Sequence, residues 1–158
     1  MIQYLLTALV CFFVGVLAFR KPDNKAAKAL AGLGFCLGLW SLELYFLTAI
    51  KDVALLSVLF HVTRCGMFFI PSMLALLVWR LVSVSARKFY SFVVFPALFT
   101  SGVISLANLF FFPSLLQETS SGGYLPKIDA IYYIFAILVV YCIVSSLVFC
   151  IVSYNRVT

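Results

Sequence analysis

Five apolar runs divide this chain and limit what it can fold into. They cover residues 2–19, 29–50, 54–82, 89–112 and 130–153, and each is close to or above the ~20 residues that an α-helix needs to cross a bilayer. Of the 158 residues, 65% are hydrophobic and only 10% are charged, so a soluble domain of this size would lack the polar groups to cover its surface. The sequence therefore predicts an integral membrane protein.

The backbone in lipid must be hydrogen-bonded within its own segment or in a closed barrel. The runs do not show the alternation of polar and apolar residues that is typical of barrel strands. We therefore expect an all-α bundle of five transmembrane helices, forming a single membrane domain over residues 1–158. The one longer connection, residues 113–129, is predicted to be an irregular external loop that either covers a pocket or tethers the last helix.

Basic residues are distributed unevenly among the connections. The connections after the second and fourth runs contain only Lys51 and Lys127. The segments at and after the ends of the first, third and fifth runs hold the other basic residues apart from Arg64: Arg20, Lys21, Lys25, Lys28, Arg80, Arg87, Lys88 and Arg156. By the positive-inside rule the N-terminus is outside, the C-terminus is cytoplasmic, and the protein is a multi-pass protein of the cell inner (plasma) membrane. The anionic inner leaflet explains the net charge of +6, so no nucleic-acid partner is required. The first run is followed by basic residues, as in a retained helix rather than a signal peptide.

Motifs of soluble enzymes and of metal sites are missing. The chain has five cysteines without a Cys-x-x-Cys pair and one histidine, so we expect no metal and no cofactor. No phosphate-binding loop, nucleophile elbow, zinc-protease or dinucleotide motif occurs either. We therefore expect no catalytic activity in this chain, and leave open a kinase or other transmitter domain beyond Thr158.

Polar side chains inside the runs, in the predicted outer half of the membrane, are the candidate functional residues. Arg64 lies about ten residues inside the third run, His61 lies on the same helix face, and Glu43 and Asn108 have comparable depths. Ionisable residues at this depth usually mark a functional site. The candidate ligand-binding or intramembrane polar cluster comprises Trp40, Glu43, His61, Arg64, Asn108, Tyr132 and Tyr133.

Each of these residues also has a structural explanation. Glu43 and Arg64 either neutralise each other as a buried ion pair, or Arg64 engages an external ligand with a carboxylate, phosphate or carbonyl group while Glu43 holds the guanidinium until then. His61 is either a core residue or a sensor of external acidity. Asn108 is suited to a hydrogen bond between helices, and the two tyrosines to an interfacial belt.

Small residues and prolines are expected to shape the bundle. Proline cannot donate to the carbonyl four residues earlier and bends a helix, and a bend at Pro71 would widen a cavity beneath Arg64. Small residues permit close approach of helices. The predicted packing residues are Gly34, Gly38, Ser101 and Ser105, and the predicted kinks are at Pro71 and Pro96.

A sparse set of positions resembles a known family. These positions are Trp40 with Ser41, Arg64, Gly66, Pro71, Pro96 and Asn108, followed by a polar loop and the aromatic start of the fifth run over residues 127–135. They resemble the seven-helix N-terminal sensor region of bacterial histidine kinases and related signalling proteins. The resemblance implies an extracytoplasmic N-terminus, a sensory bundle and a cytoplasmic transmitter. This chain has five runs where the family has seven, and ligand identity does not transfer.

The sequence thus predicts a sensor or receptor-like membrane module of a two-component or related signal transduction system. Its expected partners are the lipid bilayer, a small external ligand, and a cytoplasmic signalling domain or other membrane subunits, and a homodimer is left open. One alternative is a structural or accessory subunit of a larger membrane complex. A transporter or proton-relay component ranks third, because the inner halves of the runs are nearly all apolar.

Overall fold

The computed structural model describes residues 2–21, 23–81, 84–110, 116–118, 124–126 and 130–154. It contains the helices α1 (Ile2–Phe19), α2 (Lys25–Ala49), α3 (Val53–Leu81), α4 (Val84–Phe110) and α5 (Ala130–Tyr154), and the strands β1 (Leu116–Glu118) and β2 (Tyr124–Pro126). The five predicted helices are confirmed. Each is long and apolar enough to cross a membrane, so the chain has the helices of a multi-pass membrane protein.

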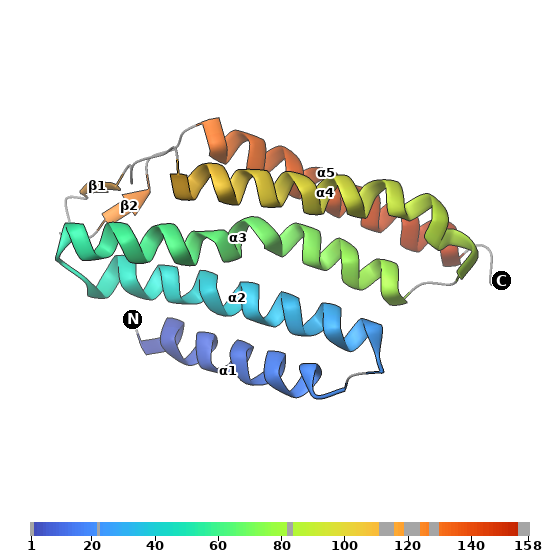
Figure 1. Ribbon diagram of the computed structural model, residues 1–158, viewed down its shortest axis with the longest axis horizontal. Coiled ribbons are helices and arrows are strands. Elements are labelled where there is room, and N and C mark those ends of the chain that lie inside the picture. Colours follow the sequence, from blue (N-terminus) through green and yellow to red (C-terminus); the bar gives the residue numbers. More distant parts are fainter. Residues whose placement is uncertain are drawn as a thin grey trace.

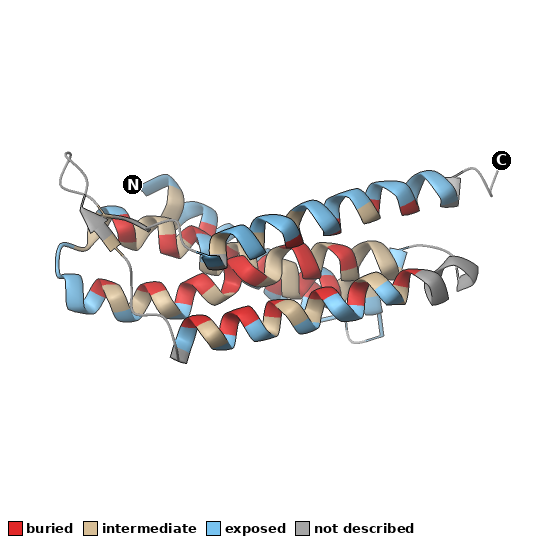
Figure 2. Cartoon of the chain, turned by 90° about the horizontal axis from the view of Figure 1, so that it is seen from above, coloured by how far each residue is buried: buried red, intermediate tan, exposed pale blue. Residues whose placement is uncertain are grey.

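The helices run roughly parallel and antiparallel to one another, and α3 occupies the centre (Figure 1). Helix α1 packs on α2, α2 packs on α3, and both α4 and α5 pack on α3 and on each other. Buried residues lie along the faces that the helices turn toward each other, whereas α5 exposes much of its outer face (Figure 2). A polar residue on the inner face of α3 is therefore surrounded by helices from both halves of the chain.

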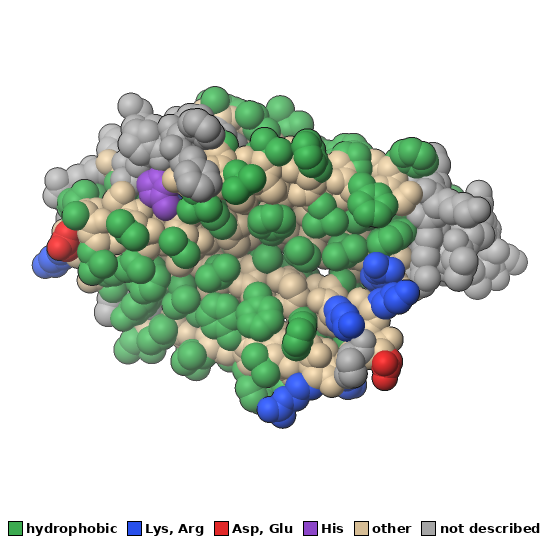
Figure 3. Space-filling model, viewed as in Figure 1, with side chains coloured by type: hydrophobic (Ala, Val, Ile, Leu, Met, Phe, Trp, Pro, Cys, Tyr) green, Lys and Arg blue, Asp and Glu red, His purple; other side chains and the backbone are tan. Residues whose placement is uncertain are grey.

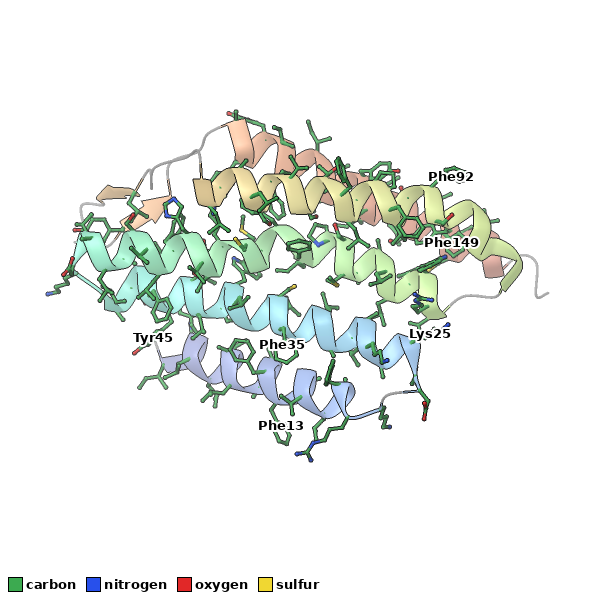
Figure 4. The ribbon with its side chains drawn as sticks, viewed as in Figure 1. Phe13, Lys25, Phe35, Tyr45, Phe92 and Phe149 are labelled. Carbon is green, nitrogen blue, oxygen red and sulfur yellow. The ribbon has the colours of Figure 1, made fainter. Side chains whose placement is uncertain are left out.

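The surface of the bundle matches a bilayer environment. Figure 3 shows hydrophobic side chains across the visible face, with most of the coloured Lys and Arg side chains gathered at the end where α1 joins α2 and α3 ends. Large side chains such as Phe13 and Phe92, with exposed fractions of 64% and 76%, point away from the bundle (Figure 4). In contrast, Phe35 turns toward α1, where its ring centroid lies 6.0 Å from that of Phe12.

Two helices begin earlier than the apolar runs predict. Helix α2 starts at Lys25, four residues before the predicted run, and α4 starts at Val84, five residues before its predicted run. For α2 the reason is a cap: the N–H groups of Ala26 and Ala27 donate to Oδ1 of Asn24 at 2.9 and 3.1 Å, which satisfies two of the free donors at the helix start. Hydropathy marks the part of a helix that suits lipid, and a helix continues beyond it wherever its end is capped or solvated.

The connection between α4 and α5 was expected to be irregular, but it contains a pair of strands. Strands β1 and β2 pair antiparallel, with Leu116 opposite Pro126 and Glu118 opposite Tyr124. The side chains of Leu116 and Tyr124 pack against a buried cluster of Leu47, Leu56 and Phe60 from α2 and α3. This packing explains the strand pair, which is too short to be recognised from an alternating pattern. The rest of residues 111–129 lies outside the described part of the chain.

Close contacts between helices occur where glycine provides room. A Cβ atom on Gly34 would lie 2.9 Å from the carbonyl oxygen of Cys11 and 3.2 Å from the backbone of Gly15, both on α1. A Cβ on Gly38 would lie 2.6 Å from the ring of Phe12. The Gly-x-x-x-Gly step of α2 is therefore the surface on which α1 packs.

Serine hydroxyls join α3 and α4 in the core. Ser101 donates to the carbonyl oxygen of Phe68 at 2.8 Å, Ser72 donates to that of Ala97 at 2.9 Å, and the two hydroxyls lie within hydrogen-bonding distance of each other. Both helices contain an internal proline, Pro71 in α3 and Pro96 in α4, and α3 changes direction along its second half (Figure 1). These interhelical bonds fix α4 on α3 near the two prolines.

Tyr90 provides a test of the packing between α4 and α5. Its hydroxyl lies 2.6 Å from Oγ of Ser146, and its ring stacks on Phe149 with a centroid distance of 4.2 Å. Tyr90→Phe keeps the stacking and leaves the Ser146 hydroxyl without this partner, so we expect a loss of about 1 kcal/mol in the free energy of unfolding in detergent. In the double variant with Ser146→Ala, the two losses should not add. A Tyr90→Phe protein as stable as wild type would contradict this role of the bond.

Candidate functional site

Four buried polar side chains form what we call the polar layer: Glu43 on α2, Arg64 on α3, and Ser105 and Asn108 on α4. Their exposed fractions are 3%, 4%, 6% and 2%, respectively. Helices α2 and α3 run in opposite directions and α4 packs on α3, so residues far apart in sequence reach the same level of the bundle. The sequence placed Glu43, Arg64 and Asn108 at similar depths, and the structure brings all three inside.

Aromatic rings surround the guanidinium of Arg64. Its Cζ atom lies 4.8 Å from the ring centroid of Phe60, 5.6 Å from that of Phe68 and 4.3 Å from that of Tyr132. Phe60 and Phe68 lie one turn before and one turn after Arg64 on the same face of α3, whereas Tyr132 comes from the first turn of α5. Desolvated cation–π contacts contribute ~2 kcal/mol or more each, and they leave the N–H groups in the guanidinium plane available for hydrogen bonds.

Hydrogen-bonding capacity is left unused in the polar layer. In the described part of the chain, the buried side-chain nitrogen and oxygen atoms without a hydrogen-bond partner are Nε and Nη2 of Arg64, Oε2 of Glu43 and Oγ of Ser105. Buried polar atoms in folded proteins are nearly always paired, and in a bilayer each unpaired group costs several kcal/mol. All of these atoms belong to the polar layer. In contrast, the hydroxyls of Ser72 and Ser101, also between α3 and α4, are hydrogen-bonded.

Glu43 and Arg64 are near each other without a salt bridge. The charge of Arg64 acts on the Glu43 carboxyl group, yet no nitrogen–oxygen contact within the 4.0 Å limit joins these two described side chains. The arrangement is therefore a separated charge pair, in which each partner keeps unbonded atoms. A group with both donors and acceptors placed at this level would satisfy both side chains.

The neighbours of the polar layer fix α4 on α3 at this height. Nδ2 of Asn108 donates to the backbone carbonyl of His61 at 3.2 Å, and Sγ of Cys65 lies 3.9 Å from the carbonyl oxygen of Ser105. The His61 imidazole is half-buried, and its Nδ1 donates to the Ser57 carbonyl at 2.7 Å within the same helix. The backbone oxygen of His61 thus joins α3 to α4, and its Nδ1 is hydrogen-bonded within α3.

Three aromatic residues of the predicted cluster have different surroundings. Tyr132 packs on Arg64, but its neighbour Tyr133 is 67% exposed, because successive residues of a helix point in directions about 100° apart. Trp40 is 38% exposed and lines an apolar cavity of about 190 Å³ together with Met67, Pro71 and Phe135. The residues that line this cavity are all apolar and do not include Arg64, so its walls suit a hydrocarbon group instead of a charge, and a cavity beneath Arg64 stays a prediction.

Phe60 was not among the residues predicted for the site. It is 1% exposed and contacts both the Arg64 guanidinium and, edge to face, the His61 ring. A spacing of four residues between an aromatic residue and an arginine places them on one helix face, and this spacing was the available signal. In an apolar run with many phenylalanines, that signal does not identify which ring contacts the arginine.

Within the described residues, no group of three or more His, Cys, Asp or Glu side chains is positioned to hold a metal ion. Comparison of the chain with protein-family models, with curated proteins and with solved structures found no match. The resemblance to histidine kinase sensor regions thus rests on the sequence positions that carry it.

Proposed function

We propose that this protein is a membrane sensory module that binds a small external ligand at the polar layer and passes a helix displacement to a cytoplasmic signalling partner. The observation that supports this most is the Arg64 guanidinium, which is 4% exposed and has two unpartnered nitrogens. Replacing a buried ion pair by well-packed apolar residues is often neutral or stabilising. A bundle that required only packing would therefore gain little from an arginine here.

The contact between Arg64 and Tyr132 suggests how binding reaches the other end of the bundle. Arg64 lies on α3 and Tyr132 on α5, and their 4.3 Å contact is in the first turn of α5. A ligand that draws the guanidinium away from the ring favours a different packing of α5 on α3, which is a population shift between two arrangements of the bundle. Both helices run from this level to the opposite end, where a signalling partner would receive the displacement.

The distribution of basic residues supports an orientation with the N-terminus outside the plasma membrane. Arg20 and Lys21 follow α1 and Arg80 lies in the last turn of α3, at the end of the bundle opposite the connection between α2 and α3 that contains Lys51 (Figure 1). In this orientation the polar layer lies in the outer half of the membrane, within reach of an external ligand. The partner at the cytoplasmic end would be a transmitter domain of the kind found in two-component systems.

Thermal unfolding in the presence of candidate ligands tests the binding step. We expect at least one member of a panel of small carboxylates, phosphates, carbonyl compounds and amino acids to raise the Tm of the purified protein in detergent. At a concentration 100-fold above Kd, binding adds ~2.7 kcal/mol to the stability, which corresponds to a shift of several degrees. If every compound shifts wild type and an Arg64→Gln variant equally, binding at the polar layer is excluded.

An accessory subunit of a larger membrane complex is the second candidate. The described spans of α1 and α5 are only 11% and 22% buried, so both present broad apolar faces that suit lipid or helices of another protein. In that case the polar layer would contact a neighbouring subunit and the isolated chain would be unstable. Purification of the chain alone as a monodisperse, cooperatively unfolding protein would count against this candidate.

A further inference from the structure

We infer that the ligand of the polar layer is a small zwitterion with a carboxylate and an ammonium group, as in an α-amino acid with a short side chain. This inference rests on the proposed function, because it names the class of ligand for the same site. It follows from which atoms of Arg64 and Glu43 lack a partner, and from the charges that the described helices bury around them.

The two unpartnered nitrogens of Arg64 form one edge of the guanidinium. Nε and Nη2 lie on the same side of Cζ, so their N–H bonds point in nearly the same direction and bind two oxygens of one group side by side. A carboxylate or a phosphate has this pair of oxygens, whereas a ketone or an aldehyde carbonyl has only one. Because both nitrogens are buried and unpartnered, this edge faces the protein interior instead of the lipid.

The position of Glu43 favours a zwitterion over a simple anion as the ligand. Its Oε2 atom is buried without a partner, and its carboxyl group lies within electrostatic reach of Arg64. When Glu43 is ionised, a simple anion on Arg64 would place a second negative charge beside it, and a buried charge without a counterion is strongly unfavourable. An ammonium group on the same ligand removes this problem, because it donates to Glu43 and keeps the total charge of the layer unchanged.

An α-amino acid carries both of the charges that this pair requires. Its carboxylate and ammonium groups are attached to one carbon atom, so one small molecule offers an acceptor to Arg64 and a donor to Glu43. No nitrogen–oxygen contact within 4.0 Å joins these two described side chains, and both keep buried atoms without a partner.

Aromatic groups surround the cationic side of the site. The rings of Phe60, Phe68 and Tyr132 lie against the guanidinium, and the ring centroid of Phe68 lies 5.5 Å from that of Phe135, which lines the apolar cavity near Pro71. Alanine is the appropriate probe, because it carries both charged groups on a small apolar side chain.

Equilibrium binding of radiolabelled L-alanine to the full chain in lipid nanodiscs tests the inference. We expect saturable binding, with acetate, ethylamine and inorganic phosphate competing at least ten times more weakly than unlabelled alanine. Acetate offers only the carboxylate and ethylamine only the ammonium, so each forms one of the two charged contacts. This comparison uses the wild-type protein and does not depend on the folding of any variant.

Variants of the two charged residues give a second, independent readout. Glu43→Gln should weaken alanine binding at least tenfold and make acetate the better ligand, because the site then holds one uncompensated positive charge. Arg64→Lys keeps the charge but loses the two-nitrogen edge, and should weaken both ligands at least tenfold.

Two substitutions outside the polar layer serve as matched controls. Asp52→Asn changes a residue whose Oδ1 accepts from the N–H groups of Ala54 and Leu55 at the start of α3, and Asn caps a helix as well as Asp. Arg80→Lys changes a residue whose guanidinium lies over the ring of Trp79. Neither control should change alanine binding.

The outcomes separate the inference from the proposed function. If acetate or phosphate binds wild type as tightly as alanine does, the ligand is an anion; the zwitterion is then overturned while the sensory role stands. If alanine binding is unchanged in both Glu43→Gln and Arg64→Lys, the polar layer is not the alanine site and the inference fails. If no compound of this set or of the thermal panel binds, both the inference and the proposed function are overturned.

Discussion

Replacing Arg64 with alanine is expected to abolish the ligand response while leaving membrane insertion intact. The variant removes both N–H groups that face the interior and the contact with Tyr132. Charge-assisted hydrogen bonds contribute ~1.5–3 kcal/mol each, so binding should weaken at least ~100-fold. Insertion is unaffected because α3 becomes more apolar, and removing an arginine from the centre of a transmembrane helix favours insertion. Ligand-dependent Tm shifts and membrane fractionation of the two proteins measure these effects.

Asn108→Ala serves as the comparison within the same layer. It removes the bond from Nδ2 to the His61 carbonyl but none of the unpartnered atoms of Arg64 and Glu43, so it should lower stability by about 1 kcal/mol and weaken binding far less than Arg64→Ala. A full ligand response in Arg64→Ala would contradict a role for this residue in binding.

Gly66→Ala is expected to have the largest effect on stability. An added Cβ atom would lie 2.5 Å from Cβ of Leu39 and 2.9 Å from the backbone oxygen of Cys36. Both atoms are fixed to the α2 backbone, so α2 and α3 must separate, and overpacking of this kind costs ~1–3 kcal/mol. The ~1 kcal/mol by which alanine is the better helix former offsets only part of this loss when the overpacking cost is in the upper part of its range. Because Glu43 and Arg64 lie on these two helices, ligand binding should weaken as well.

Gly102→Ala is the matched control for this substitution. Gly102 lies inside α4, and an added Cβ would have no atom within 4 Å, so the higher helix propensity of alanine should raise stability slightly or leave it unchanged. The free energies of unfolding of the two variants in the same detergent provide the comparison. Equal stability of Gly66→Ala and Gly102→Ala would show that α2 and α3 do not require glycine at their contact.

The length and number of the helices follow directly from the sequence because hydropathy depends on local composition. The first helix was predicted with its observed bounds, Ile2–Phe19. The start of α2 was missed because the cap at Asn24 extends the helix through Lys25 and Lys28, beyond the apolar run. The strand pair was missed because its stability depends on packing against Leu47, Leu56 and Phe60, which lie more than fifty residues away in the sequence.

The depth of the site residues along their helices could be predicted from the sequence, but the direction in which their side chains point could not. The regular rise of a helix was sufficient to place Glu43, Arg64 and Asn108 at one level. The rotation of each helix about its axis depends on which faces meet, and this rotation turns Glu43 inward and leaves Trp40 38% exposed on the same helix. The enclosure of Arg64 by aromatic rings and its separation from Glu43 depend on side-chain conformations, which the spacing of residues does not specify.

The central claim is that ligand binding at Arg64 moves α5 relative to α3. It is tested most directly by pulsed electron paramagnetic resonance between spin labels at Leu81 and Val152, which are 68% and 43% exposed near the ends of these helices, in a variant without the five native cysteines. With a saturating amount of the compound that raises the Tm most, we expect the distance to change by ~1–2 Å or more, and to stay constant in the Arg64→Ala protein. An identical distance distribution with and without the bound compound would contradict the sensory mechanism.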